Sequence, residues 1–146
     1  MNGKLDQRGA IAPLGSRPAI LAGIMDAKRY SFEDLREIMA RLRAPDGCPW
    51  DKEQTHESIK EYLLEEAYEF LEAVEEGNNA HMREELGDVL LQVVFHAQMA
   101  SEAGHYGMDE VIHELADKLV RRHPHVFGEV AVTGSDEVVV NWEAIK

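Results

Sequence analysis

The chain of 146 residues contains one cysteine, few aromatic residues and little positive charge. A single cysteine, Cys48, excludes a disulfide within the chain, which is typical of proteins from the reducing cytoplasm. Only 15 lysine and arginine residues stand against 28 aspartate and glutamate residues, so the net charge is −13. This balance argues against binding to nucleic acid or to an anionic membrane surface, because both attract positively charged proteins.

The sequence also lacks a long hydrophobic run. No apolar stretch reaches about 18 residues, the length that a membrane-spanning helix needs. Residues 9–25 follow two basic residues, as the apolar part of a signal peptide does, but Pro13, Arg17 and Pro18 interrupt them. We therefore expect a cytoplasmic protein that neither crosses nor binds a membrane.

Residues 1–30 are rich in glycine, proline and alanine and are expected to form a flexible N-terminal arm. Residues 31–146 are expected to form one domain, in which apolar residues recur at helical spacing and strand signals are nearly absent. Four helices are predicted. The first is capped by Ser31 and ended by Pro45. The other three cover about residues 55–76, about residues 80–103, and the stretch from about residue 108 to just before Pro124.

Two segments are less regular. Residues 44–51 contain too many helix breakers for a helix, and a loop is expected after Gly128. The terminal segment 135–146 contains three consecutive valines, so both helix and strand remain open there. The predicted fold class is all-α, an antiparallel helical bundle of about four to five helices.

The helix predicted over residues 80–103 is apolar nearly all round. Its polar residues form one narrow strip, which consists of Glu85, Asp88, Gln92 and His96. A helix without a broad polar face is buried on all sides. Because so small a domain has too few helices to cover it, we expect a second subunit to do so, which makes the protein a homodimer.

Two acidic motifs lie on either side of Gly77, at residues 65–69 and 85–88. If the two helices fold back antiparallel about this glycine, residues that face each other have numbers with a constant sum. The pairs Glu66 with Asp88 and Glu69 with Glu85 have the same sum, and the acids within each helix share a face because they are three residues apart. Four carboxylates are therefore expected at one level of the helix pair.

Carboxylates that face one another repel and raise each other's pKa unless a cation lies between them. One acidic motif alone is usually a solvated helix face, but a second motif in matching register favours a metal site. Asp88 adds to this, since a carboxylate in an apolar helix is costly without a partner. Ligation by oxygen alone favours Mg²⁺ or Mn²⁺ over zinc, so the pattern predicts a metal site for phosphate chemistry.

Basic and aromatic residues near the C-terminus are candidates for substrate binding. Lys118 and Arg122 are four residues apart and share a helix face, which suits phosphate oxygens. Trp142 and Lys146 have the same spacing and offer an aromatic plane and an amine for a base and a phosphate. A basic last helical turn and a tryptophan packed on the bundle are the ordinary structural alternatives.

Several segments, in this order, resemble the MazG family of nucleoside triphosphate pyrophosphohydrolases. They are CPWD (48–51), LEEAYE (64–69), ELGDVLLQVVFHA (85–97), KLVRRHPHVFG (118–128) and NWEAIK (141–146). The resemblance covers about residues 31–146. It implies an all-α dimer, or a dimer of dimers, that uses Mg²⁺, with Mn²⁺ as a substitute, to hydrolyse nucleoside triphosphates to monophosphates and pyrophosphate. Such an activity would serve house-cleaning of the nucleotide pool.

The resemblance also implies roles for individual residues. The family's metal ligands correspond to Glu66, Glu69, Glu85 and Asp88, and its nucleotide contacts to Lys118, Arg122, Trp142 and Lys146. A metal-bound water would attack the α-phosphorus, and either Glu65 or Glu69 would orient that water or take its proton. The sequence leaves the choice between these two glutamates open.

Alternative functions differ in what they need from the sequence. An enzyme of narrower substrate specificity, such as a dCTP, dUTP or phosphoribosyl-ATP pyrophosphatase, would keep the metal site and change the base pocket. A noncatalytic helical dimer would not need the acidic residues. A di-iron bundle is disfavoured, because no histidine follows Glu85 or Asp88 by three residues. Many bacterial members of the family carry two such domains, and this sequence carries one. Broad hydrolysis of NTPs and dNTPs is expected, since no base-reading set is evident.

Overall fold

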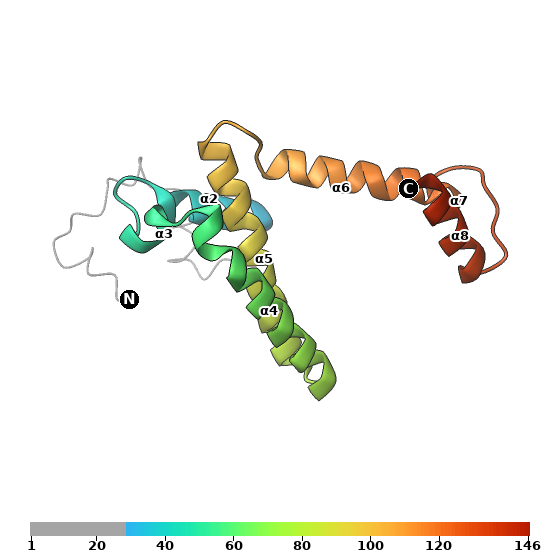
Figure 1. The fold of residues 1–146 in the computed structure, drawn as a ribbon, viewed down its shortest axis with the longest axis horizontal. Helices are drawn as coiled ribbons and strands as arrows, with labels where there is room; N and C mark the ends of the chain where they lie inside the picture. Colours follow the sequence, from blue (N-terminus) through green and yellow to red (C-terminus); the bar gives the residue numbers. More distant parts are fainter. Residues whose placement is uncertain (1–28) are drawn as a thin grey trace. The chain divides into compact units, whose positions relative to one another are not determined.

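A computed structural model of the chain describes residues 29–146, which are helical and contain no strand (Figure 1). The all-α prediction is confirmed. The helices are α2 (Phe32–Arg43), α3 (Pro49–Glu53), α4 (His56–Glu76), α5 (Asn79–Glu102), α6 (Met108–Arg122), α7 (Pro124–Phe127) and α8 (Ser135–Ile145). Residues 1–28, nearly all of the predicted arm, lie outside the described part of the chain.

The first helix begins where its cap predicts. Ser31 accepts a hydrogen bond from the backbone N–H of Asp34, and the Asp34 side chain accepts one from the backbone N–H of Ser31. This reciprocal pair satisfies two N–H groups that a helix start leaves without partners. Helix α2 ends at Arg43, just before the predicted break at Pro45.

The expectation of no helix within residues 44–51 is wrong, because α3 begins at Pro49. Proline occupies the first helical position, where its fixed φ angle suits a helix and its missing N–H is not needed. The Arg43 side chain donates hydrogen bonds to the carbonyl oxygens of Asp51 and Gln54 and so fastens α3 to the end of α2. Trp50 lies on this helix and is 51% exposed.

Helices α4 and α5 form the antiparallel hairpin that the acidic motifs predict (Figure 1). Gly77 ends α4 with a φ of 67°, and its N–H bonds to carbonyl oxygens of the last turn. The side-chain oxygen of Asn78 then accepts hydrogen bonds from the N–H groups of Ala80 and His81, which caps the start of α5. At the other end of the hairpin the rings of His56 and His96 are stacked, with centroids 5.0 Å apart.

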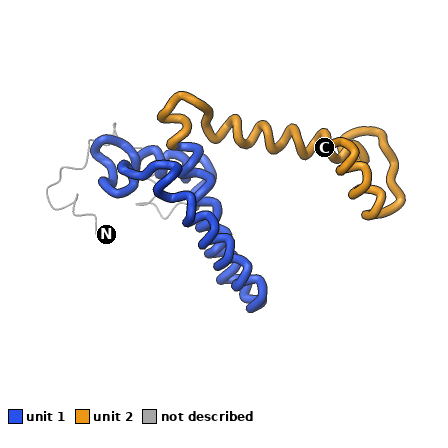
Figure 2. The backbone as a smooth tube through the Cα atoms, in the orientation of Figure 1, with its two compact units in different colours: residues 1–98 blue, residues 99–146 orange. Residues whose placement is uncertain are grey.

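The chain divides into two compact units, residues 1–98 and 99–146 (Figure 2). Among the described residues of the first unit, the buried apolar side chains come from α2, α4 and α5, and they are Met39, Ile59, Ala73, Val94, Phe95 and Ala97. The guanidinium of Arg43 lies 5.5 Å from the centroid of the Phe95 ring and covers one edge of this core.

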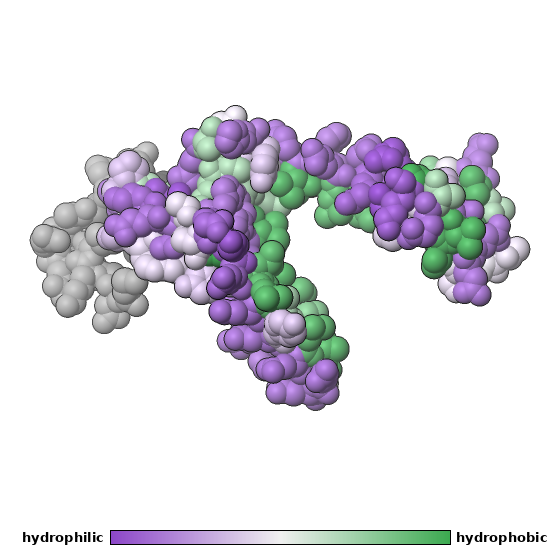
Figure 3. Space-filling model, in the orientation of Figure 1, coloured by the Kyte–Doolittle hydropathy of each residue, from purple (hydrophilic) through white to green (hydrophobic). Residues whose placement is uncertain are grey.

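The hairpin also leaves large apolar side chains exposed, and Figure 3 shows apolar surface along it. On α5, Val94 and Phe95 are buried, but Leu90 and Leu91 remain 37% and 36% exposed. On α4 the exposed large apolar side chains are Tyr62, Leu63, Leu64, Tyr68, Leu71 and Val74. Among residues 29–146, no helix is long and apolar enough to span a membrane.

In the second unit, α6 contacts both α7 and α8. The short helix α7 begins at Pro124 and was not expected from the sequence. The terminal segment is a helix, which decides the open question of helix or strand. Its start is fixed by Glu137, whose side chain accepts hydrogen bonds from the N–H and the hydroxyl of Thr133, at 2.9 Å each.

Candidate functional site

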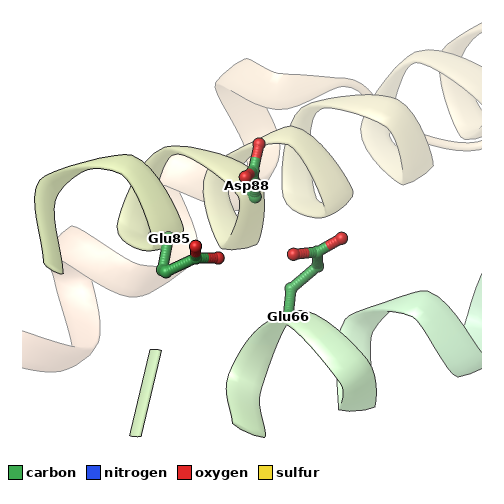
Figure 4. A group of neighbouring side chains, drawn as sticks. All are labelled: Glu66, Glu85 and Asp88. Carbon is green, nitrogen blue, oxygen red and sulfur yellow. The ribbon is translucent and has the colours of Figure 1, made fainter. Parts of the chain in front are cut away.

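Three of the four predicted metal ligands meet at one level of the α4–α5 hairpin. Glu66 extends from α4, and Glu85 and Asp88 extend from α5, so that the three carboxylates converge between the helices (Figure 4). Each contributes an oxygen that lies within 4.8 Å of the other two. The register of the hairpin thus brings the two acidic motifs together as the sequence predicts.

Glu69, the fourth predicted ligand, is not part of this group of three. It is exposed on α4, one turn after Glu66, yet its charge reaches both neighbours and raises the pKa of Glu66 and of Glu85. Glu65 is also exposed and has a weaker effect of the same sign on the pKa of Glu66. Both glutamates therefore border the cluster on its α4 side.

The cluster is electrostatically unfavourable without a cation. Burial raises the pKa of Glu66, and the charges of Asp88, Glu69 and Glu85 raise it further. Burial also raises the pKa of Glu85, which is only 8% exposed, and the Glu69 charge adds to this. Low solvation and like charge both disfavour the ionised acids, so binding a divalent cation would relieve both.

One oxygen of Glu85 carries the most specific information about what the cluster could hold. Oε1 lies 3.0 Å from Nε2 of His81, whereas Oε2 is buried and has no hydrogen-bond partner among the described residues. Buried polar atoms are nearly always paired, so an unpaired carboxylate oxygen in a cluster of carboxylates suits binding of a cation. A donor set made only of carboxylate oxygens fits Mg²⁺ or Mn²⁺.

His81 is a residue of this site that sequence reasoning missed. Its Nδ1 lies 2.8 Å from Oε2 of Glu76, at the end of α4, and its Nε2 faces Glu85. The hydrogen bond with Glu76 raises the pKa of His81, and Glu85 acts in the same direction. The spacing of four residues between His81 and Glu85 on one helix is the signal that could have revealed it.

The predicted nucleotide contacts belong to the second unit. The guanidinium carbon of Arg122 on α6 lies 5.1 Å from the Trp142 ring centroid, and Nζ of Lys146 lies 5.9 Å from it. Nε of Arg122 and Nε1 of Trp142 are buried without a hydrogen-bond partner among the described residues. Lys118 is exposed on α6, one turn before Arg122. The structure thus places two of the predicted residues, Arg122 and Lys146, next to the ring of a third, Trp142.

Comparison with known proteins gives a consistent picture. The model of the MazG nucleotide pyrophosphohydrolase domain matches residues 54–127, which include every acid of the cluster. The nucleoside triphosphate pyrophosphohydrolase/pyrophosphatase MazG of Thermotoga maritima is 61% identical over 98 residues, which are 67% of this chain and 38% of that protein. The nucleoside triphosphate pyrophosphohydrolase of Escherichia coli K12 is 51% identical over 116 residues, 79% of this chain and 44% of that protein.

A protein of Bacillus subtilis described as uncharacterized, YabN, is 53% identical over 117 residues, 80% of this chain and 24% of its own length. The chain therefore spans less than half the length of each of these three relatives. Among solved structures, the crystal structure of a mazG-related protein from Thermotoga maritima superposes with a TM-score of 0.65 at 28% identity. That superposition covers 77% of this chain and 96% of the solved chain.

Proposed function

The chain belongs to the MazG nucleotide pyrophosphohydrolase family, and on this premise we propose that it hydrolyses nucleoside triphosphates to nucleoside monophosphates and pyrophosphate. The observations that support this most strongly are the convergence of Glu66, Glu85 and Asp88 and the buried, unpaired Oε2 of Glu85. Two relatives bear the name nucleoside triphosphate pyrophosphohydrolase, in agreement with an activity on phosphate chains.

In this proposal Glu66, Glu85 and Asp88 hold Mg²⁺, with Mn²⁺ as a substitute, and Glu69 joins them by a change of rotamer. When bound, the metal supplies positive charge for the phosphate chain and lowers the pKa of a coordinated water. The protein contributes by fixing the carboxylates in place before the substrate arrives. The raised pKa of Glu66 and of Glu85 implies that protons compete with the metal at acidic pH.

The hydrolysis needs one proton acceptor on the protein. Water oxygen attacks the α-phosphorus, the bond to the oxygen that bridges the α- and β-phosphates breaks, and pyrophosphate leaves. The proton of the attacking water passes to a carboxylate at the border of the cluster, for which Glu65 and Glu69 are the two candidates. Both are exposed on α4 beside Glu66, so both are accessible to a water molecule.

Nucleotide binding is assigned to the second unit. The Trp142 ring offers a stacking surface for a base, and Lys118, Arg122 and Lys146 offer positive charge for phosphates. None of these groups reads the hydrogen-bond pattern of a particular base, which favours broad hydrolysis of NTPs and dNTPs over a narrow dNTP or phosphoribosyl-ATP specificity. Broad hydrolysis would suit house-cleaning of the nucleotide pool.

We further propose that the chain works as a homodimer or as a dimer of such dimers. The support is the exposed apolar surface of α4 and α5, where Leu64, Tyr68 and Leu71 are 60%, 61% and 53% exposed. Contiguous exposed apolar surface of this kind is typical of a protein interface. A noncatalytic helical dimer would bury the same surface, but it would have no use for the acidic cluster.

An assay of pyrophosphate release tests the catalytic proposal. The full chain is incubated with each common NTP and dNTP in Mg²⁺ and in excess chelator. We expect pyrophosphate and monophosphate from several nucleotides with Mg²⁺ and none with chelator. Turnover of a single nucleotide would favour a narrow pyrophosphatase, and no turnover of any nucleotide would favour the noncatalytic dimer.

A further inference from the structure

We propose that His81 is a positioning residue for the acidic cluster. It engages Oε1 of Glu85 and thereby holds this carboxylate in the orientation that leaves Oε2 available to a cation. This inference rests on the proposed function in one respect, namely that a divalent cation binds the cluster. His81 does not itself touch the metal or the substrate in this account, so it acts only through Glu85.

The contacts of His81 form a chain of three side chains from the surface to the cluster. Glu76 is 56% exposed and lies 2.8 Å from Nδ1 of His81, whose side chain is 33% exposed. On the other ring edge, Nε2 lies 3.0 Å from Oε1 of Glu85, whose side chain is only 10% exposed. Each imidazole nitrogen thus faces one carboxylate oxygen, which fixes both the position and the plane of the ring.

The turn of the hairpin makes this arrangement possible. Glu76 is the last residue of α4, and His81 lies in the first turn of α5, on the same face as Glu85 one turn later. The left-handed conformation of Gly77 and the cap formed by Asn78 bring these two helix ends together. The turn is therefore linked directly to the carboxylate group that we assign to the metal.

Positioning matters because a glutamate side chain has many rotamers, most of which must be given up when it ligates a metal. An ion-pair contact with His81 that already orients Glu85 reduces this loss. Partners of this kind, next to metal ligands, typically change metal affinity or activity by about 10–100-fold when removed. The alternative is that His81 only stabilises the turn through Glu76, and the two contacts can be separated by substitution.

The test compares Mn²⁺ binding to the full chain, by calorimetric titration without nucleotide, for the wild type and three variants. In His81→Gln the amide nitrogen reaches about as far as Nε2, so the contact with Glu85 is kept. In His81→Asn it reaches only as far as Nδ1, so the contact with Glu76 is kept and that with Glu85 is lost. His81→Ala loses both. Circular dichroism verifies that each variant is folded.

We expect Mn²⁺ affinity close to that of the wild type for His81→Gln, and a loss of about 10–100-fold for His81→Asn and His81→Ala. Equal affinity in all four proteins would overturn the proposal, and so would loss in His81→Gln with retention in His81→Asn. A wild type that binds no Mn²⁺ would instead refute the metal site of the proposed function. These results are distinguishable, because the last one is seen in the wild type alone.

Discussion

Replacement of Trp142 by alanine separates its contribution to protein stability from its proposed contribution to nucleotide binding. In the structure two cations lie near its ring, with Arg122 at 5.1 Å and Lys146 at 5.9 Å from the ring centroid. Cation–π contacts contribute about 0.5–1 kcal/mol each even at exposed sites, and Trp142 is only partly exposed. Trp142→Ala should therefore lower the free energy of unfolding by about 1–2 kcal/mol, to which lost packing between α6 and α8 adds.

The effect on substrate binding should be separate from this loss of stability. Stacking of one base on an aromatic side chain is typically worth about 1–3 kcal/mol, which corresponds to an increase in KM of about 5–150-fold. Because stacking acts on the ground state and the transition state alike, kcat should change little. The measurement is steady-state pyrophosphate release at saturating Mg²⁺, at a temperature at which urea unfolding shows the variant to be folded.

A matched control is Trp142→Phe, which keeps an aromatic plane and removes the indole N–H. That N–H is buried and has no hydrogen-bond partner among the described residues, so its removal should cost little. We expect a KM close to that of the wild type for the phenylalanine variant. An unchanged KM in Trp142→Ala would show that the tryptophan only packs the second unit, and would remove it from the proposed nucleotide site.

Three further predictions concern the first unit. Asp88→Asn should reduce pyrophosphate release by more than about 100-fold. Urea unfolding of the metal-free variant should show equal or greater stability than the wild type, because one repelling charge is gone. Turnover at the wild-type rate would remove Asp88 from the site. Burial and the charge of His56 lower the pKa of His96 below its usual 6.5, so the stability that neutral His96 contributes is full above pH 6.5 and lost as pH falls through the folded pKa. The free energy of unfolding should therefore fall more steeply from pH 7 to 5 in the wild type than in His96→Gln. Parallel curves of unfolding free energy against pH would contradict this. Gly77→Ala should lower the free energy of unfolding by about 1–2 kcal/mol, because Gly77 has a φ of 67°. Gly87, where an added Cβ is equally free of contacts, lies inside α5, so Gly87→Ala should raise the free energy of unfolding by about 0.5–1 kcal/mol. Losses of equal size in the two variants would show that backbone conformation is not the cause.

Most helix boundaries could be predicted because the groups that set them are local in sequence. Ser31 and Thr55 accept hydrogen bonds from the N–H groups three residues later, and Gly77 adopts the left-handed conformation that ends α4. Such interactions depend on a few neighbouring residues. The pattern of residues therefore indicates them without knowledge of the tertiary structure.

The two short helices were missed for a different reason. Both α3 and α7 begin at a proline, Pro49 and Pro124, and proline favours a helix start as much as it disfavours a helix interior. From the sequence alone the same residue indicates a break. Whether a proline begins a short helix or only breaks one depends on tertiary contacts, such as those of Arg43 with the carbonyl oxygens of Asp51 and Gln54.

The acidic cluster was predictable to the level of the helix register but not of the rotamer. Equal sums of residue numbers place the two motifs opposite each other, and Glu66, Glu85 and Asp88 do converge. Glu69 lies outside the group of three, although it is close enough to Glu85 to raise its pKa, and side-chain orientation of this kind carries no sequence signal. His81 was missed because its role depends on the turn that brings it beside Glu76.

The prediction that α5 is buried on all sides needs a partner that the sequence only implies. Within the described residues Val94 and Phe95 are buried, but Leu90 and Leu91 are not, and α4 exposes a row of apolar side chains beside them. The sequence indicates how much apolar surface must be covered. It does not identify what covers it, so the dimer stays a prediction.

The most direct test of the account is a crystal structure of the full chain grown with Mn²⁺ and a nonhydrolysable nucleoside triphosphate, with anomalous scattering recorded at the manganese edge. The account predicts an anomalous peak between Glu66, Glu85 and Asp88, with the metal also bound to a phosphate oxygen. Nucleotide bound in the crystal with no anomalous peak at these three carboxylates would contradict it.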